Sequence, residues 1–271
     1  MNNYTLTEIN IYPIKSLGGI SLQEAQIEDR GLRYDRRWML VDETGRFLSQ
    51  RQHGIMALLQ VHLQDEGLLV THKHEKYTPL LIPFSPKTEE RVQVSVWDDT
   101  CEAVIVAAEA NEWFTNVLQM PARLVYMPLD TKRKVDERYA FEEEVVSFAD
   151  GYPFLMIGQA SLDDLNLRLA EPVPMNRFRP NLVFSGGTPF IEDTWDEFSI
   201  GEAAFRAAKP CARCVVVTIN QETGNKSAEP LKTLATFRQK NNKIMVGQNL
   251  LLTKGSKVMV GDKVDVVTTK A

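Results

Sequence analysis

Short runs of apolar residues, or of alternating apolar and polar residues, recur through the first 107 positions of the chain. They include Trp38–Val41, Ala57–Val61 and Val92–Trp97, and each has the length of a strand rather than of a helix. Turn-forming residues separate these runs, as at Asp42–Gly45 and Asp65–Gly67. Many short strands at this spacing predict a barrel or a sandwich in this part of the chain.

Helical spacing of apolar residues appears first at 108–119, where Trp113, Phe114, Val117 and Leu118 recur. A second helix is predicted at 161–170. Its N-cap would be Ser161, and its leucines at spacing three and four would form the buried stripe. A third is predicted at about 228–239.

Strand patterns return in the last third of the chain, at Asn181–Phe184, Val215–Ile219 and Lys257–Val260. The final stretch, 260–267, alternates like a strand that closes a barrel. By contrast, the charged stretch 130–138 has no apolar period, so we expect an exposed loop there, close to a domain junction near 120–127.

Composition limits the class of protein. The 271 residues are enough for one large or two medium domains. A net charge of -5 argues against a general nucleic-acid-binding protein. The sequence contains no run of 18 apolar residues, so it predicts no membrane span, and its first residues lack the pattern of a secretory signal. The chain has only three cysteines, and so low a number is typical of proteins in a reducing compartment. We therefore expect a cytoplasmic location.

The pair Cys211 and Cys214, in Cys-Ala-Arg-Cys, allows several interpretations. It could be half of a zinc site, but the histidines all lie far upstream. A thioredoxin-type redox pair would open a helix, whereas the residues that follow predict a strand. Plain packing of buried cysteines is a third interpretation. The fourth is a soft thiolate for a soft transition metal, favoured electrostatically by Lys209 and Arg213.

Basic side chains next to turns form a second pattern. Lys15 and Ser16 follow an expected strand, and further cations occur at Asp35–Arg37, Ser49–Gln52 and Asn176–Asn181. Arginine and hydroxyl groups suit phosphate, although each of these cations could equally be a solvated surface charge. Sequence signatures of common hydrolases and nucleotide-binding loops are absent.

Taken together, these segments resemble the MOSC-domain proteins (molybdenum cofactor sulfurase C-terminal domain) that carry an N-terminal MOSC β-barrel domain. The resemblance is greatest to the mitochondrial amidoxime-reducing component and its bacterial counterparts. Five segments in the same order carry it: Tyr12–Ser16, Gly31–Trp38, Asn176–Leu182, Asp193–Glu197, and Cys211–Cys214 with Thr218 and Glu222–Gly224.

The resemblance implies a mixed, mostly β fold. Two β-barrel-like domains, at 1–122 and 123–271, would carry a few peripheral helices and enclose a cofactor cleft. It further implies a molybdenum cofactor of the molybdopterin form, with Cys214 as the metal ligand and catalytic centre. The residues that would hold the cofactor are Lys15, Ser16, Arg36, Asp150, Gly151, Tyr152, Arg177, Arg179, Asn181 and Arg213. Eukaryotic relatives have asparagine at the place of Arg177.

The activity implied by the resemblance is reduction of small N-hydroxylated compounds such as amidoximes, hydroxylamines and N-hydroxy bases. Some bacterial relatives carry a C-terminal ferredoxin domain that this chain lacks, so we expect a separate ferredoxin- or flavin-type electron donor. An alternative is a cofactor carrier or a sulfur-transfer module with a persulfide on Cys214. A pyridoxal-phosphate-dependent desulfurase would then be its partner. A third alternative is a non-catalytic binding module. No nucleic-acid or membrane partner is expected.

Overall fold

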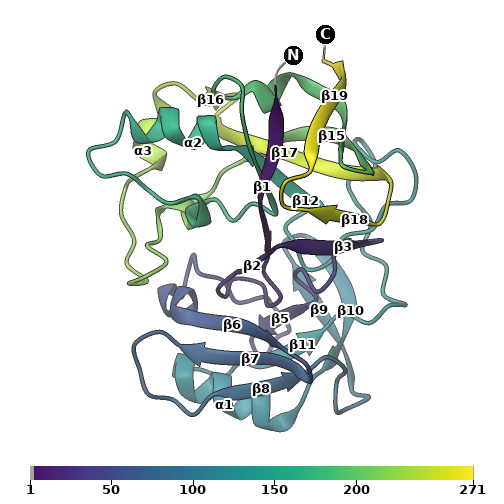
Figure 1. The fold of residues 1–271 in the computed structure, drawn as a ribbon. Helices are drawn as coiled ribbons and strands as arrows, with labels where there is room; N and C mark the ends of the chain where they lie inside the picture. The colour runs from purple at the N-terminus through teal and green to yellow at the C-terminus, as the bar shows by residue number, and fades with distance from the viewer. Residues whose placement is uncertain (1–2, 271) are drawn as a thin grey trace.

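A closed seven-stranded β-barrel forms the upper half of the computed structural model, which describes residues 3–270 (Figure 1). Each strand is hydrogen-bonded to the next, and pairing of the last with the first closes the ring. In order, the strands are β12 (Phe154–Gly158), β13 (Leu182–Ser185), β1 (Tyr4–Ile11), β19 (Lys263–Thr269), β14 (Trp195–Ile200), β15 (Ala203–Ala212) and β17 (Lys243–Lys254). Alternating strand positions bury Leu6, Phe154, Trp195, Phe198 and Phe205 in one core cluster.

The first strand of the chain belongs to this barrel. β1 pairs with β13 on one side and with β19 on the other, so the first and last strands of the chain lie side by side (Figure 1). Hydrogen bonding therefore crosses the predicted boundary between residues 122 and 123, and that division of the chain stays a prediction. Short strands extend from the barrel: β2 (Ile20–Leu22), β16 (Gln239–Lys240) and the sheet of β18 (Lys257–Met259), β3 (Glu24–Glu28) and β4 (Gly31–Leu32).

The N-terminal lobe, residues 38–126, is a half-barrel built from two sheets (Figure 1). One contains β5 (Trp38–Val41), β11 (Arg123–Tyr126), β10 (Asp99–Ile105) and β9 (Arg91–Val96), and the other contains β6 (Leu59–Gln64), β7 (Gly67–His72) and β8 (Leu80–Pro83). Helix α1 (Ala108–Leu118) covers this lobe with Ala110, Phe114 and Val117 buried. The predicted first helix and the mostly β, two-barrel-like fold class are thus confirmed.

The other two helices are shorter than predicted. α2 (Gln159–Asn166) begins two residues early, and Ser161 does not cap it. Instead the buried Ser161 hydroxyl donates to the Glu192 carboxylate at 2.8 Å. The Asn166 side chain pairs with the backbone of Val173, which ends the helix. α3 (Leu231–Ala235) ends early because residues 239–240 join β17 as a strand.

The predicted strand Val215–Ile219 is wrong. Residues Val215–Thr218 form a 3-10 helix, η4, that begins directly after Cys214. β-branched residues favour a strand only where a partner strand can accept their backbone hydrogen bonds. Here the Arg177 guanidinium donates to the Val217 carbonyl instead, at 3.3 Å. The remaining 3-10 helices are η1 (Gly54–Leu58), η2 (Met175–Arg177) and η3 (Ile191–Thr194).

Smaller differences occur elsewhere. In the run predicted at 57–61 the strand starts only at Leu59, and the last barrel strand spans Lys263–Thr269 after a turn. The charged stretch 130–138 has no regular structure, as predicted, but it is not simply exposed. Thr131, Arg133 and Val135 are buried in alternation. Within residues 3–270, no helix is both long and apolar enough to cross a bilayer.

Candidate functional site

A pocket lies where the barrel meets the N-terminal lobe, and both contribute side chains to it. Its empty volume is about 860 Å³ with the solvent at its mouth included. The predicted site residues that line it are Lys15, Ser16, Arg36, Asp150, Gly151, Tyr152, Arg179, Asn181, Arg213 and Cys214. The roles proposed for them stay predictions.

Lys15 and Ser16 enter the pocket from the segment after β1. The Lys15 backbone N–H donates to the Trp38 carbonyl at 2.8 Å, which anchors the segment to β5. The buried Lys15 ammonium donates to the Phe148 carbonyl at 2.7 Å and to the Asp150 carboxylate at 2.6 Å. Burial lowers the pKa of Lys15 to about 8, so this cation titrates close to physiological pH.

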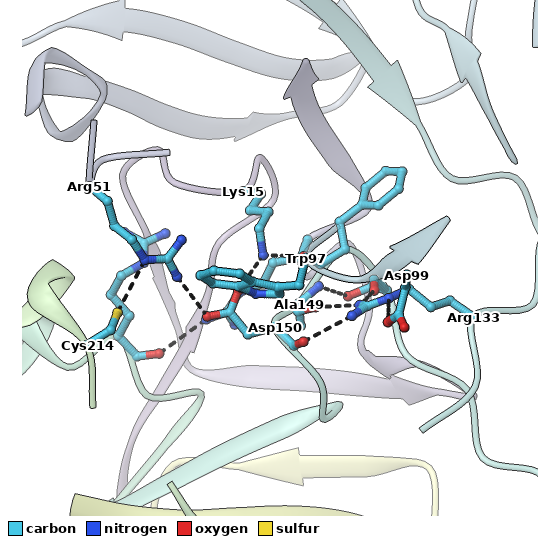
Figure 2. Close-up of polar contacts among 12 residues, drawn as sticks. Lys15, Arg51, Trp97, Asp99, Arg133, Ala149, Asp150 and Cys214 are labelled. Atoms are coloured by element: carbon cyan, nitrogen blue, oxygen red, sulfur yellow. Dashed lines mark hydrogen bonds and ion pairs between the residues drawn. The ribbon is translucent and has the colours of Figure 1, made fainter. Parts of the chain in front are cut away.

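Two buried cations fix the loop that carries Asp150, as Figure 2 shows. Besides Lys15, the Arg133 guanidinium donates to the carbonyls of Ser147, Ala149 and Asp150, at 2.9, 2.5 and 3.0 Å. Burial acts to raise the pKa of Asp150, but the charges of Lys15 and Arg51 outweigh it and hold that pKa well below its usual range. Asp150 is therefore an anion in a mostly cationic pocket.

Arg36 and Arg179 are held against one aromatic ring. Their guanidinium carbons lie 4.3 and 4.1 Å from the centroid of the Tyr12 ring. Arg36 Nη1 also donates to both carboxylate oxygens of Asp35, at 2.8 and 2.7 Å. Burial lowers the pKa of Arg179 to about 10, so it stays charged at neutral pH.

Three pocket residues other than glycine have a left-handed backbone: Ser16, Arg36 and Arg179, with φ of 70°, 49° and 54°. This conformation costs an L-residue roughly 1–2 kcal/mol, and such strain is concentrated at functional sites. The strain supports a ligand-binding role for this pocket.

Asn181 and Arg177 differ in position. Asn181 lines the pocket, but its side-chain amide also joins two strands. It donates to the Asn10 carbonyl at 3.1 Å and accepts from the Leu155 N–H at 3.2 Å. Arg177 does not line the pocket. Its guanidinium lies buried against Val217, so it supports the segment that follows Cys214 rather than the pocket wall.

The two cysteines have different surroundings. Cys214 is exposed at the pocket surface, directly before η4. Cys211 is partly buried in β15, and its sulfur accepts a hydrogen bond from Arg213 Nη1 at 3.0 Å. Arg213 Nη2 also donates to the Phe178 carbonyl at 2.5 Å. Both cysteines line the pocket, and Cys214 is the more exposed thiol of the pair.

Three residues of this site do not stand out in the sequence: Gln50, Arg51 and Arg133. Arg51 Nε lies 3.5 Å from Cys214 Sγ, and Gln50 donates to the Ser16 carbonyl at 2.7 Å. The sequence pattern marks Gln50 and Arg51 only as part of a basic segment and places Arg133 in an exposed loop. No local pattern distinguishes them, because their partners lie more than 10 positions away in the sequence.

Among residues 3–270, three pocket side chains have a buried polar atom without a hydrogen-bond partner: Arg179 Nη2, Arg213 Nε and Tyr152 Oη. Buried polar groups in native proteins are almost always satisfied, so such atoms point to a ligand with acceptor groups. Over the same residues, no cluster of three or more His, Cys, Asp and Glu side chains could hold a metal. The pocket offers one exposed thiol that could ligate a metal and several cations that could bind an anion. This set fits an anionic cofactor that brings most of its own metal ligands.

Comparisons with known proteins agree with this arrangement. Residues 3–121 match the MOSC N-terminal beta barrel domain, and residues 143–265 match the MOSC domain. The chain is 31% identical over 278 residues to mitochondrial amidoxime-reducing component 1 of Homo sapiens, covering 96% of this chain and 82% of that protein. For the same protein of Mus musculus, identity is 33% over 245 residues, covering 86% and 71%.

A second kind of relative is longer. Molybdenum cofactor sulfurase of Oryza sativa subsp. japonica is 32% identical over 264 residues, which cover 89% of this chain and 32% of that protein. The domain matches and these identities agree with the resemblance carried by the cysteine pair and the arginine segments. The chain therefore belongs to the MOSC family, with an N-terminal MOSC β-barrel domain ahead of its MOSC domain.

Proposed function

We propose that this chain binds a molybdenum cofactor in the pocket, with Cys214 as its thiolate ligand, and reduces N-hydroxylated compounds. The observation that carries the proposal is the exposed Cys214 thiol in a cationic pocket with three unsatisfied polar atoms. Similarity to amidoxime-reducing components over most of the chain supports the choice of substrate.

Each group of pocket residues has a distinct role in this proposal. Lys15, Arg36 and Arg179 would bind the phosphate group by charge and directed N–H donors. Asn181 and the loop Asp150–Tyr152 would contact the polar ring system. The cofactor would supply two-electron removal of oxygen from the N-hydroxy group, with water as the second product. The protein would orient the substrate in front of Cys214 and limit the access of bulk water.

Electrons for this reaction would come from a separate donor protein. Cys214 is exposed, so a ferredoxin- or flavin-type donor could approach the pocket from solvent. A cytoplasmic location remains part of the proposal. The names of several relatives place those proteins in mitochondria.

A second candidate function is a cofactor carrier or a sulfur-transfer module. The match to molybdenum cofactor sulfurase, at 32% identity, favours it, as does the accessibility of the Cys214 thiol. The thiol would accept sulfur as a persulfide from a pyridoxal-phosphate-dependent desulfurase.

One preparation distinguishes the two functions. The chain is produced in a host that makes the cofactor, bound molybdenum is measured, and benzamidoxime reduction is assayed with an artificial electron donor. Bound molybdenum with turnover supports the reductase. Molybdenum without turnover on any N-hydroxy compound favours the carrier. A wild-type protein without molybdenum from a competent host contradicts the cofactor proposal itself.

A further inference from the structure

Arg51 reaches from the N-terminal lobe to the cysteine of the opposite half of the molecule (Figure 2). Its Nε–H points at Cys214 Sγ, with 3.5 Å between nitrogen and sulfur. Its Nη2 lies 3.4 Å from Asp150 Oδ2. One planar guanidinium therefore contacts both the thiol and the only carboxylate that lines the pocket within residues 3–270.

Trp97 holds the guanidinium in this orientation. It lies at the tip of the hairpin β9–β10, and its ring centroid is 4.0 Å from the guanidinium carbon of Arg51. The indole N–H donates to Asp150 Oδ1 at 3.1 Å, so the ring itself is fixed. Trp97 is 48% exposed and has a left-handed backbone with φ of 59°. The left-handed φ fits the two-residue hairpin turn between Val96 and Asp99, and the exposed ring packs on the Arg51 guanidinium and against Phe47.

The backbone around Arg51 is also fixed. The amides of Gln52 and His53 both donate to the Ser49 carbonyl, at 3.1 and 3.0 Å, and form a tight turn. The neighbouring Gln50 is buried and exchanges hydrogen bonds with Gln221, at 3.2 and 2.9 Å. Arg51 side-chain entropy is therefore largely lost before any ligand binds, because only 17% of the side chain is exposed.

We propose that Arg51, held by Trp97, is a positioning residue for Cys214 that donates an N–H···S hydrogen bond to the metal-ligating sulfur. The inference rests on the proposed function, because it assigns Cys214 as the ligand. Partners of metal ligands orient the ligand and tune the metal. A hydrogen bond to a ligating sulfur withdraws electron density from it, so the bound metal is reduced at a higher potential.

The contact itself is tested in protein that holds no cofactor. Arginine is labelled with ¹⁵N, and exchange of the Arg51 Nε–H proton with water is followed by NMR. The slowly exchanging Arg51 signal should be lost in Cys214→Ala and kept in Cys211→Ala. An Arg51 signal that exchanges equally fast in the wild type and in Cys214→Ala would overturn the proposal, whatever the protein binds.

The effect on the metal is tested in cofactor-loaded protein with Arg51→Met. The matched control is Arg91→Met, which removes a surface arginine from the strand leading to Trp97. Arg51→Met should keep its molybdenum but show a lower midpoint potential by EPR titration and turnover reduced by roughly 10-fold. Arg91→Met should match the wild type in both measurements.

Substitutions of Trp97 separate positioning from general damage. Trp97→Phe keeps an aromatic face for Arg51 and should preserve the potential, whereas Trp97→Ala should shift it in the same direction as Arg51→Met. An unchanged potential in Arg51→Met would contradict the proposal. Absence of molybdenum from the wild type would contradict the cofactor assignment, while the NMR result still decides the contact.

Discussion

Cys211 and Cys214 are three positions apart, but their side chains do different things. The partly buried Cys211 sulfur accepts a hydrogen bond from its neighbour Arg213, whereas the exposed Cys214 sulfur accepts one from Arg51 of the opposite lobe. A pattern of two cysteines cannot distinguish them, because their burial depends on residues far away in the sequence, and so does the contact of Cys214 with Arg51, 163 positions away. The sequence resemblance assigns the ligand role to Cys214, and in the structure this thiol is the more exposed of the two.

Exchanging each sulfur for oxygen tests this difference. Cys214→Ser should lose bound molybdenum, because a serine hydroxyl is a hard and weakly acidic ligand. Cys211→Ser should retain it. Metal analysis of both variants, purified in parallel with the wild type, measures the outcome. Full retention of molybdenum in Cys214→Ser would disprove the ligand assignment and leave the family assignment untouched.

The charge on Lys15 predicts a pH dependence for anion binding. Burial lowers the pKa of Lys15 from 10.5 to about 8. The ammonium is therefore charged below this pH and becomes neutral as the pH rises through it. Retention of a phosphate-bearing cofactor should weaken above about pH 8. Dialysis of loaded protein at a series of pH values, followed by pterin fluorescence, measures it.

Two variants control this experiment. Lys15→Arg keeps its charge over the whole range, so its retention should depend less on pH. Lys15→Met should retain the cofactor poorly at every pH. If Lys15→Met shows the same loss at alkaline pH as the wild type, another group causes the dependence.

At the scale of elements, local patterns predicted regular structure better than irregular structure. The spacing of Phe114 and Val117 predicted α1 to within one residue, since one face of that helix packs on a core. The residues after Cys214 formed η4 instead of a strand, because no partner strand lies beside them. The burial of Arg133, in the stretch 130–138, was not predicted, because the carbonyl groups that it contacts lie 14 to 17 positions away.

Arg133 should therefore contribute strongly to stability. Arg133→Met leaves the carbonyls of Ser147, Ala149 and Asp150 without this donor. An unsatisfied buried acceptor costs roughly 1–3 kcal/mol, so we expect the free energy of unfolding to fall by about 3 kcal/mol. Arg138→Met, in the same stretch, removes an exposed ion pair with Asp136 and a distant contact with the Tyr139 ring, and should change little. If urea denaturation gives the same loss of unfolding free energy for both variants, Arg133 does not have this stabilising role.

At the scale of the molecule, the segment after η4 fastens the two halves together. Gln221 pairs with Gln50, and the Lys73 ammonium donates to the Glu222 carboxylate at 2.6 Å. Gly224 meets Gly54 backbone to backbone, and a Cβ atom on Gly54 would lie only 2.3 Å from the Gly224 carbonyl oxygen. The position of Cys214 in the pocket thus depends on contacts with the N-terminal lobe.

A methyl group at Gly54 tests this junction. Gly54→Ala must push the two backbones apart, and overpacking of this kind typically costs about 1–3 kcal/mol. We expect a lower melting temperature and poorer cofactor retention. Gly151→Ala is the stability control, because no heavy atom beyond its own residue and its two chain neighbours lies within 4 Å of the added methyl group. A melting temperature of Gly54→Ala equal to that of wild type would show that the halves tolerate separation there.

The sequence by itself determined the mostly β class, the first helix, the cysteine pair and most of the basic residues that reach the pocket. These follow from local alternation, from helical spacing and from the residue types that suit a metal and a phosphate. Only the tertiary structure placed β1 in the barrel, distinguished Arg51 and Arg133 from surface cations, and moved Arg177 out of the pocket wall. The reason is physical: hydrogen bonds and charges act between atoms that are close in space, and the chain brings such atoms together from distant positions.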